Sequence, residues 1–327
     1  MAHTPGLKAA LKRGALIAAA NWPLVVVQFV AESALKLLLA VPIVGGAFLV
    51  ALLLDTSLTS LLSGDVRDIV TSILAALMAS PVALAAFVTS TLLVLAGGSV
   101  VTFVVKGGTV ALLAEAERVA GPIDRPPLRL EAMRRASVVA IDPFIEGCVR
   151  LWRRYVRIGL LLLLMYAATA AGYLGVVIGG YALVGNSAVL LGWTVTAAAA
   201  SSALIVWITL LNFFYLMTQM VVAIEDVSVR RGFRMAMAFV WGHLREVAGV
   251  FGVVLVMVVI ATAASILATA GLGLIAFVPL VGLAVLPLQL AAWLVRGIVF
   301  EYLALAALGA YLSHYRWYHS SSDIRVA

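Results

Sequence analysis

The sequence predicts an all-α, polytopic membrane protein, and three features support this fold class. Of the 327 residues, 64% are hydrophobic and only 11% are charged, whereas about 25% are charged in an ordinary soluble domain. The mean hydropathy of +1.15 describes a chain with too little polar surface to cover a water-soluble globule. Long apolar runs with few charges also recur along the chain. These features exclude a soluble enzyme, a nucleic-acid-binding domain and a disordered protein.

Six apolar runs are long enough to cross a bilayer, because a spanning helix needs about 20 residues. We expect one transmembrane helical bundle over 1–327, with spans at about 23–54, 82–105, 158–184, 190–222, 247–270 and 285–312. The first run far exceeds the apolar core of a signal peptide, about 7–15 residues, so we expect it to be retained. The run 69–80 is too short to span, and we expect an interfacial or re-entrant helix there.

The connections between the spans alternate in charge, and this alternation predicts their orientation. The N-terminal arm, 106–157, 223–246 and the C-terminal tail together carry 19 Lys and Arg residues, whereas the opposite connections carry one, Arg67. Cytoplasmic connections of membrane proteins are enriched in Lys and Arg. The sequence therefore predicts a multi-pass protein of the cytoplasmic (inner) membrane with both termini in the cytoplasm. The net charge of +7 then requires no nucleic-acid partner.

Three basic, amphipathic segments each precede a pair of spans, and they begin at Leu11, Leu128 and Val229. We expect them to form cytoplasmic interfacial helices. The first and third share two basic residues followed by glycine, at Gly14 and Gly232. This pattern is consistent with a three-fold repeat of one interfacial helix and one two-helix hairpin, since internal repeats are common in membrane folds. Ala-rich helices can also match in this way by chance.

Two clusters of arginine are candidate binding faces for anionic lipid headgroups or a phosphate-bearing solute. One lies at the start of the third span, at the spacing of a single helix face, and comprises Arg150, Arg153, Arg154 and Arg157. The other lies on the segment from Val229 and comprises Arg230, Arg231 and Arg234. Ordinary interfacial anchoring by snorkelling arginines is the alternative interpretation of both clusters.

Four charged residues fall inside the predicted spans, and they are Glu32, Lys36, Arg296 and Glu301. Charges within a membrane are costly and are usually paired. Because Lys36 and Glu301 lie at similar depths, we expect the first and sixth spans to be neighbours joined by a Lys36–Glu301 ion pair. Such a network would either close the helical bundle or couple an ion or substrate to transport.

The sequence lacks several common catalytic motifs. It contains no GxxxxGK[ST] phosphate loop, no HExxH zinc motif and no GxSxG nucleophile elbow. The paired aspartates of membrane CDP-alcohol transferases are also absent. Its one cysteine and four histidines are scattered. We therefore expect no enzymatic activity, no metal ion and no cofactor.

Part of the chain resembles a family of bacterial six-helix membrane proteins, similar to the membrane domain attached to some glycerophosphodiester phosphodiesterases. The resembling parts are the start of the third span, KGGTVALLAEAERV from Lys106 and VVAIEDVSVRRGFRMAMAFV from Val221. The resemblance covers roughly 100–265. It implies a fold and no catalytic residue, because the hydrolase domain of some relatives is absent.

These observations leave two functions open. The first is a non-enzymatic scaffold or accessory subunit that interacts with anionic lipids at the cytoplasmic face or with a membrane protein complex. The alternative is a small transporter or permease for a lipid-like or anionic solute. A water-accessible cavity at the four intramembrane charges would favour transport, whereas a dry, fully paired network would favour the scaffold.

Overall fold

The computed structural model describes residues 6–53, 79–124, 130–183, 187–276 and 281–326. Within these ranges the chain is helical apart from short connections, and it forms no β-strand. The all-α fold class is therefore confirmed. The segment 69–80, where we expected an interfacial or re-entrant helix, lies almost wholly outside the described residues.

Nine helices form within the described ranges. They are α1 (Leu7–Ala20), α2 (Trp22–Leu53), α5 (Pro81–Val119), α6 (Leu130–Ala136), α7 (Ile141–Leu183), α8 (Ser187–Glu225), α9 (Val229–Gly242), α10 (Leu244–Ala276) and α11 (Val281–Val326). Six of them, α2, α5, α7, α8, α10 and α11, contain segments long and apolar enough to cross a membrane. The six predicted spans are confirmed, and the protein is a multi-pass membrane protein.

The six long helices exceed what a bilayer requires. They contain between 32 and 46 residues, so even the shortest is about 48 Å long, against a hydrocarbon core of about 30 Å. Helices of this length tilt or project beyond the hydrocarbon. In α7 the arginine-rich segment and the third span form one continuous helix from Ile141. The basic N-terminal part of this helix and its apolar span therefore share one helix.

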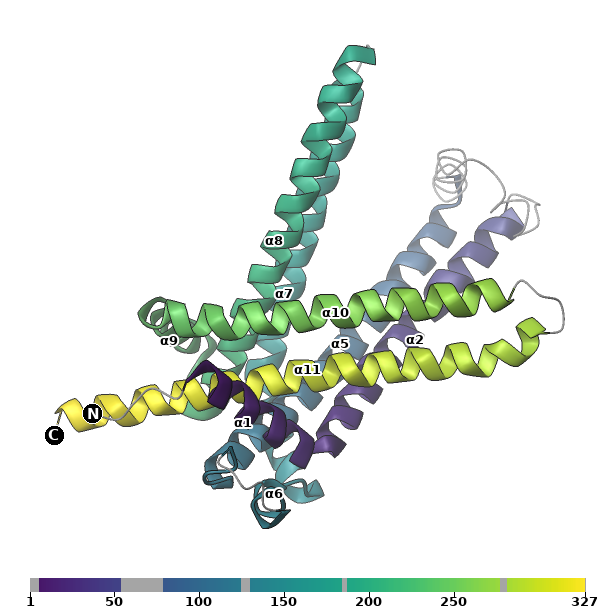
Figure 1. Ribbon diagram of the computed structural model, residues 1–327. Helices are drawn as coiled ribbons and strands as arrows, with labels where there is room; N and C mark the ends of the chain where they lie inside the picture. The colour runs from purple at the N-terminus through teal and green to yellow at the C-terminus, as the bar shows by residue number, and fades with distance from the viewer. Residues whose placement is uncertain (1–5, 54–78, 125–129, 184–186, 277–280, 327) are drawn as a thin grey trace.

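The order of the helices matches the predicted repeat. A short helix precedes each of three hairpins: α1 precedes α2 and α5, α6 precedes α7 and α8, and α9 precedes α10 and α11. Figure 1 shows the hairpins leaving a common region in different directions, with α1, α6 and α9 gathered there. We term this region the base, and it comprises α1, α6, α9 and the adjoining ends of the long helices.

The three units pack in a closed order at the base. The second helices of the hairpins, α5, α8 and α11, contact one another. α9 packs on α8, the second helix of the preceding hairpin, and α1 packs in the same manner on α11 of the last hairpin. In the middle unit the start of α7, rather than α6, packs along α5. The N-terminal unit thus closes against the C-terminal unit.

Glycine allows the closest of these crossings. A Cβ atom on Gly14 of α1 would overlap the carbonyl oxygen of Ala306 and lie 2.5 Å from the backbone nitrogen of Ala310, both on α11. A Cβ atom on Gly309 would in turn lie 2.9 Å from the Cα of Gly14. The backbones of α1 and α11 are therefore in direct contact, which a side chain at either glycine would prevent.

The glycine of the third unit lies at the corresponding crossing. Gly232 of α9 faces the Val222 side chain of α8, and a Cβ atom there would overlap that side chain. The two basic-basic-glycine triplets, which end at Gly14 and Gly232, thus mark equivalent positions in the first and third units. This correspondence supports the repeat that their sequence similarity predicts.

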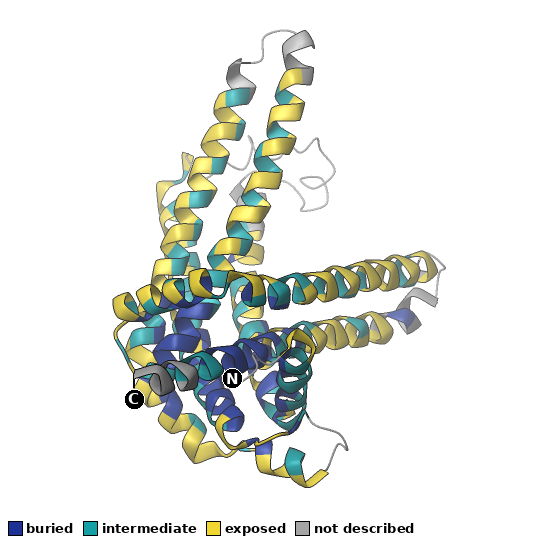
Figure 2. Cartoon of the chain, turned by 60° about the vertical axis from the view of Figure 1, so that its left-hand side comes forward, coloured by how far each residue is buried: buried dark blue, intermediate teal, exposed yellow. Residues whose placement is uncertain are grey.

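The buried core lies in the base and not in the hairpins (Figure 2). Its largest fully buried side chains include Tyr155, Tyr311, Tyr315 and Phe239. Farther along the hairpins, apolar side chains such as Leu164, Ile178, Ile260 and Leu274 are exposed. Water would make such surfaces unfavourable, whereas lipid chains solvate them. The exposed surfaces of the hairpins are therefore the lipid-facing ones.

Candidate functional site

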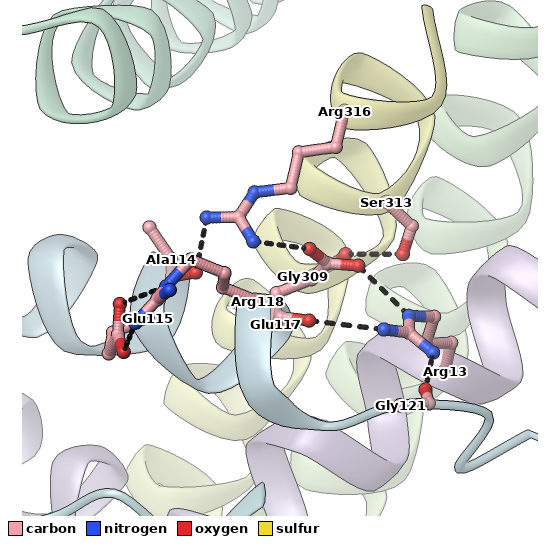
Figure 3. Close-up of polar contacts among 9 residues, drawn as sticks. All are labelled: Arg13, Ala114, Glu115, Glu117, Arg118, Gly121, Gly309, Ser313 and Arg316. Carbon is pink, nitrogen blue, oxygen red and sulfur yellow. Dashed lines mark hydrogen bonds and ion pairs between the residues drawn. The ribbon is translucent and has the colours of Figure 1, made fainter. Parts of the chain in front are cut away.

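Glu117 is the centre of a buried ion-pair cluster that joins the two ends of the chain. Its carboxylate is only 7% exposed and lies 3.0 Å from a guanidinium nitrogen of Arg13 and 3.0 Å from one of Arg316. Figure 3 shows the two guanidinium groups converging on this carboxylate. Arg13 also donates to the Gly121 carbonyl oxygen, and Arg316 donates to that of Ala114 at 2.7 Å. Because the chain itself satisfies these charges, the cluster is a structural one.

The sequence analysis did not identify this cluster, although a signal exists. Glu117 continues the apolar face of α5 that contains the buried residues Val110 and Leu113, since these positions recur at helical spacing. A carboxylate at a core position requires a buried cationic partner. Which arginines supply it depends on the packing of α1 and α11, and Arg13 is 104 positions away in the sequence.

Asn21 fixes the junction between α1 and α2 to the end of α6. It is fully buried, and its side-chain amide donates to the carbonyl oxygens of Ile17 at 2.9 Å and Ala136 at 2.8 Å. Its side-chain oxygen accepts a hydrogen bond from the Val138 amide at 3.0 Å. These bonds fix the positions of α1, α2 and the end of α6 relative to one another in the base.

The arginines predicted at the start of the third span do share one face of α7. Leu151 and Tyr155, on the opposite side, are fully buried and face α5. The exposed members of the arginine face are Arg150, Arg153 and Arg157. None of them forms an ion pair with a carboxylate of the described chain. This face is therefore a local excess of positive charge.

The fourth member of this face, Arg154, has a different role. It donates through both terminal nitrogens to the two carboxylate oxygens of Asp226, in the turn between α8 and α9. Asp226 has a positive φ of 49°, a conformation that Asp and Asn tolerate better than most residues. The pair ties α7 to the start of α9, and these helices are in contact. Both predicted basic faces therefore belong to one region of the base.

α9 has a buried face and a basic face. Gly232, Ala236, Phe239 and Val240 are buried, and α9 packs on α8. Arginine and aromatic side chains are exposed: they are Arg230, Arg231, Arg234, Phe233 and Trp241. The combination of exposed arginine and aromatic side chains is typical of a helix that lies at a membrane interface.

The structure contradicts one predicted intramembrane contact. α2 and α11 are neighbours, as expected, and the rings of Phe29 and Trp293 have their centroids 5.9 Å apart. The Lys36–Glu301 ion pair, however, is wrong. Lys36 Nζ lies 4.0 Å from Glu32 of its own helix, and Glu32 also pairs with Lys106 of α5 at 3.6 Å. The i,i+4 spacing brings Lys36 to Glu32, while its side chain stays 70% exposed.

The remaining two intramembrane charges differ in environment. Arg296 is exposed, and its guanidinium group lies over the ring of Phe300, 5.7 Å from the centroid. Glu301, on the neighbouring helix α11, interacts electrostatically with Glu32 and with Lys106 and Lys36. The structure therefore brings Glu32, Lys36 and Glu301 together, with Lys106 as an additional member that the sequence analysis did not assign, and it leaves Arg296 apart.

Across the described ranges, no group of three or more His, Cys, Asp and Glu side chains is placed to hold a metal ion. Two features of the structure are available to a ligand. One is the basic surface of the base formed by the exposed arginines, and the other is the cluster of charged side chains around Glu32 between the spanning helices.

These features define a multi-pass helical membrane protein with a folded, basic base and three lipid-facing hairpins. No family model, no curated protein and no solved structure matches the chain. The resemblance to the membrane domain of glycerophosphodiester phosphodiesterases therefore rests on the order of elements and the segments quoted for it, and it stays a prediction.

Proposed function

We propose that the protein is a non-catalytic scaffold or accessory subunit of the cytoplasmic (inner) membrane that binds anionic lipid headgroups through its base. Both termini lie in the cytoplasm in this proposal. The observation that carries it is the division of the arginines of the base into two sets. One set is neutralised within the chain, whereas the other is exposed and unneutralised.

The neutralised set stabilises the fold. Arg13 and Arg316 pair with Glu117, and Arg154 pairs with Asp226. Arg118 and Arg135 pair with glutamates on their own helices. These residues have their charge balanced whether or not a lipid is present.

The exposed set has a different environment. Its members on α7 and α9 are Arg150, Arg153 and Arg157 and Arg230, Arg231 and Arg234, and two further exposed arginines without an ion pair in the described chain are Arg134 of α6 and Arg245 of α10. No carboxylate of the described chain pairs with any of them. Exposed aromatic side chains, Trp152 and Phe233, accompany them, as expected where a protein meets the headgroup layer. Each basic residue close to an anionic membrane surface contributes about 1 kcal/mol to binding of that surface. The contributions of the six exposed arginines on α7 and α9 therefore add to one another.

The orientation follows from the same charges. The segments rich in Lys and Arg include α1, α6 and α9 and the C-terminal part of α11, which the structure gathers at the base (Figure 1). A base in the cytoplasm satisfies the preference of basic residues for that side. The anionic lipids of the inner leaflet then lie beside the exposed arginines.

Native mass spectrometry of the full chain tests lipid binding. The protein is titrated with phosphatidylglycerol and, separately, with phosphatidylcholine of the same acyl chains. We expect preferential retention of phosphatidylglycerol, and we expect the double variant Arg230→Gln/Arg231→Gln to lose much of that preference. The triple variant Arg150→Gln/Arg153→Gln/Arg157→Gln should act in the same direction.

The matched control is Arg118→Gln/Arg135→Gln, which removes the same charge as the α9 double variant but from neutralised positions. We expect this control to retain phosphatidylglycerol like the unmodified protein. An equal loss in the control would show that binding follows net charge alone, and it would contradict a site at the exposed arginines. A protein that co-purifies at fixed stoichiometry would instead favour the accessory-subunit form of the proposal.

A second candidate function is transport of a lipid-like or anionic solute. The observation that favours it is the exposure of Lys36 and Arg296 within segments long and apolar enough to span a membrane, because charged side chains there commonly mark solute pathways. Uptake of a lipid-like anion into proteoliposomes tests it. Uptake by the unmodified protein that is abolished by Lys36→Met and by Arg296→Met would favour transport. Uptake no greater than that of empty liposomes would contradict transport and favour the scaffold proposal.

A further inference from the structure

The first half of α7, residues 141–157, carries apolar side chains on its exposed surface. Ile141, Ile145 and Val149 are 76%, 52% and 66% exposed. Their spacing of four residues places them side by side on one face of the helix. We term these three residues the α7 stripe. A contiguous apolar surface of this kind, when it lies in water, marks a site of interaction.

The helices α7 and α8 change from charged to apolar at the same level, which marks the edge of the hydrocarbon. The apolar run of α7 begins at Ile158, and that of α8 ends at Ile224. Asp226, two residues beyond the end of that run, pairs with Arg154 of α7. The segment 141–157 carries six charged residues, and charges are costly in hydrocarbon. The first half of α7 therefore lies outside the hydrocarbon.

The α7 stripe also lies beyond the lipid headgroups. At 1.5 Å per residue, Val149, Ile145 and Ile141 precede Ile158 by about 14, 20 and 26 Å along the helix. A tilt of about 40°, the upper end of the range for spanning helices, reduces these distances from the hydrocarbon to about 10, 15 and 20 Å. The headgroup layer is only about 5–8 Å thick on each side. The stripe therefore meets water unless another protein segment covers it.

The opposite side of this part of α7 is fixed on α5. Gly147 lies on the side of α7 opposite the stripe, and a Cβ atom there would lie 3.3 Å from the Cα of Gly108 on α5. The two backbones are thus in close contact. Because the stripe belongs to a helix that is already held in place, a partner would bind it at little cost in ordering the surface.

The charges beside the α7 stripe change sign along the helix. Asp142 and Glu146 flank the end far from the membrane, whereas Arg150 and Arg153 flank the end near it, all on the same side of the stripe. All four side chains are exposed, and none forms an ion pair within the described part of the chain. A partner of uniform charge would be repelled at one end. The complementary partner is basic at the far end and acidic near the membrane.

A second copy of this chain does not have that complementary pattern. Two copies in one membrane share the same orientation, so a symmetric pair has its axis along the membrane normal and its α7 helices run in the same direction. Asp142 and Glu146 of one copy would then face the same carboxylates of the other, and the arginines would face arginines. Such like-charge contacts are unfavourable. The charge pattern therefore favours a segment of a different protein.

We propose that the α7 stripe is the docking surface for an amphipathic helix of a partner protein, basic at its end far from the membrane and acidic at its end near the membrane. An apolar face with anchors one turn apart is the feature by which such helices are recognised. The inference rests on the accessory-subunit form of the proposed function, because it describes the partner of that form. It does not depend on lipid binding by the exposed arginines.

A synthetic helical peptide tests the surface on the full chain in phosphatidylcholine nanodiscs. The peptide has a leucine face, two lysines at one end and two glutamates at the other, and fluorescence anisotropy measures its binding above that to empty nanodiscs. The control peptide has the same composition with lysine and glutamate alternating, so it is not complementary in either direction. We expect the first peptide to bind about tenfold more tightly, since each exposed ion pair contributes modestly. No binding of the first peptide, or equal binding of both, would overturn the proposal.

Substitutions in the protein locate the binding. Ile145→Ser/Val149→Ser should weaken binding of the first peptide by at least about tenfold, because it removes most of the apolar contact. The same variant should retain phosphatidylglycerol like the unmodified protein, so failure of this inference and failure of lipid binding are distinguishable. The matched control, Leu130→Ser/Leu244→Ser, removes two exposed apolar side chains from α6 and α10 and should not affect either measurement. Equal peptide binding by Ile145→Ser/Val149→Ser and the unmodified protein would contradict a docking surface at the stripe.

Spin labelling distinguishes the other occupants of the stripe. With Cys148→Ser as background, a nitroxide attached to Ile145→Cys in nanodiscs should be more accessible to a water-soluble nickel complex than to oxygen, which concentrates in lipid. Greater accessibility to oxygen would assign the stripe to the membrane. Dipolar coupling between the labels of two chains would assign it to a second copy. Either result would overturn the proposal.

Discussion

At the scale of single residues, Glu117 links three helices through one carboxylate. It is almost fully buried and pairs with Arg13 of α1 and Arg316 of α11. Breaking a buried pair by removing one partner costs more than the pair itself contributes, because the remaining charge has no partner. The stability of the base should therefore depend strongly on this residue.

We expect Glu117→Gln to lower the free energy of unfolding by about 2–4 kcal/mol, somewhat below the full cost for a buried pair because both arginines keep some solvent contact. The thermal unfolding midpoint in detergent measures the change. Glu115→Gln is the matched control, since it removes a carboxylate from the exposed Glu115–Arg118 pair two residues away, and it should cost no more than about 1 kcal/mol. Equal effects of the two substitutions would contradict a special role for Glu117.

The contact between Gly14 and α11 gives a second prediction at this scale. A Cβ atom at Gly14 meets backbone atoms of α11, which cannot rotate away, so α1 must move. We expect Gly14→Ala to destabilise the protein by about 1–3 kcal/mol. At Gly252 of α10 a Cβ atom meets nothing within 4 Å, so Gly252→Ala should be neutral or stabilise by up to about 1 kcal/mol. A stable Gly14→Ala variant in thermal unfolding would refute this view of the crossing.

At the scale of helices, α1 and α9 are equivalent parts of the repeat with different tolerances. Gly14 approaches backbone, whereas Gly232 approaches only the Val222 side chain. A side chain can change rotamer at a cost of about 0.5–1.5 kcal/mol, and alanine recovers part of this through its higher helix propensity. The two glycines therefore mark the same position but are not equally constrained.

We accordingly expect Gly232→Ala to change the free energy of unfolding by less than about 1 kcal/mol, clearly less than Gly14→Ala. Thermal unfolding of the two variants side by side measures the difference. Gly232→Ala combined with Val222→Ala supplies the control, because removing the Val222 methyl groups makes room for the new Cβ atom and should relieve any steric cost. A larger effect at Gly232 than at Gly14 would contradict the prediction that the crossing of α9 on α8 is less tightly constrained than the crossing of α1 on α11.

Helical periodicity explains why the arginine faces could be predicted and the Lys36–Glu301 pair could not. Which residues share a helix face depends on spacing within one helix, so the common face of Arg150, Arg153, Arg154 and Arg157 follows from the sequence. An ion pair between helices also depends on their rotation and distance. Glu32 pairs with Lys36 on its own helix and with Lys106 on α5. These pairs cannot be predicted from the depths of residues along two helices, because depth does not determine helix rotation or distance.

At the scale of the whole molecule, the closed order of three units brings α1 and the C-terminal part of α11 together at the base. α1 packs on α11, and Arg13 and Arg316 meet at Glu117. A chain with six spans returns to the side from which it started, so the arrangement agrees with the charge bias of the connections.

Cysteine labelling in intact cells tests the predicted orientation. With Cys148→Ser as background, a reporter cysteine at Ser137, which is exposed in the base, should react with a membrane-impermeant maleimide only after the membrane is opened. A reporter at Asn186, where the charge pattern of the sequence predicts a connection on the opposite side of the membrane, should react from outside in intact cells. The opposite pattern would reverse the orientation and would remove the inner leaflet as the source of the anionic lipid.

The sequence by itself determined the membrane class, the six spans, the three short helices and the faces of the arginines. All of these follow from composition and from spacing along the chain, which are local properties. Only the tertiary structure decided that Glu117 is the centre of the ion-pair cluster in the base, that Gly14 and Gly309 let α1 and α11 touch, and that Glu32 pairs with Lys106. These contacts join residues far apart in the sequence. They depend on how whole helices pack, and packing selects one arrangement among many that share the same hydrophobic pattern.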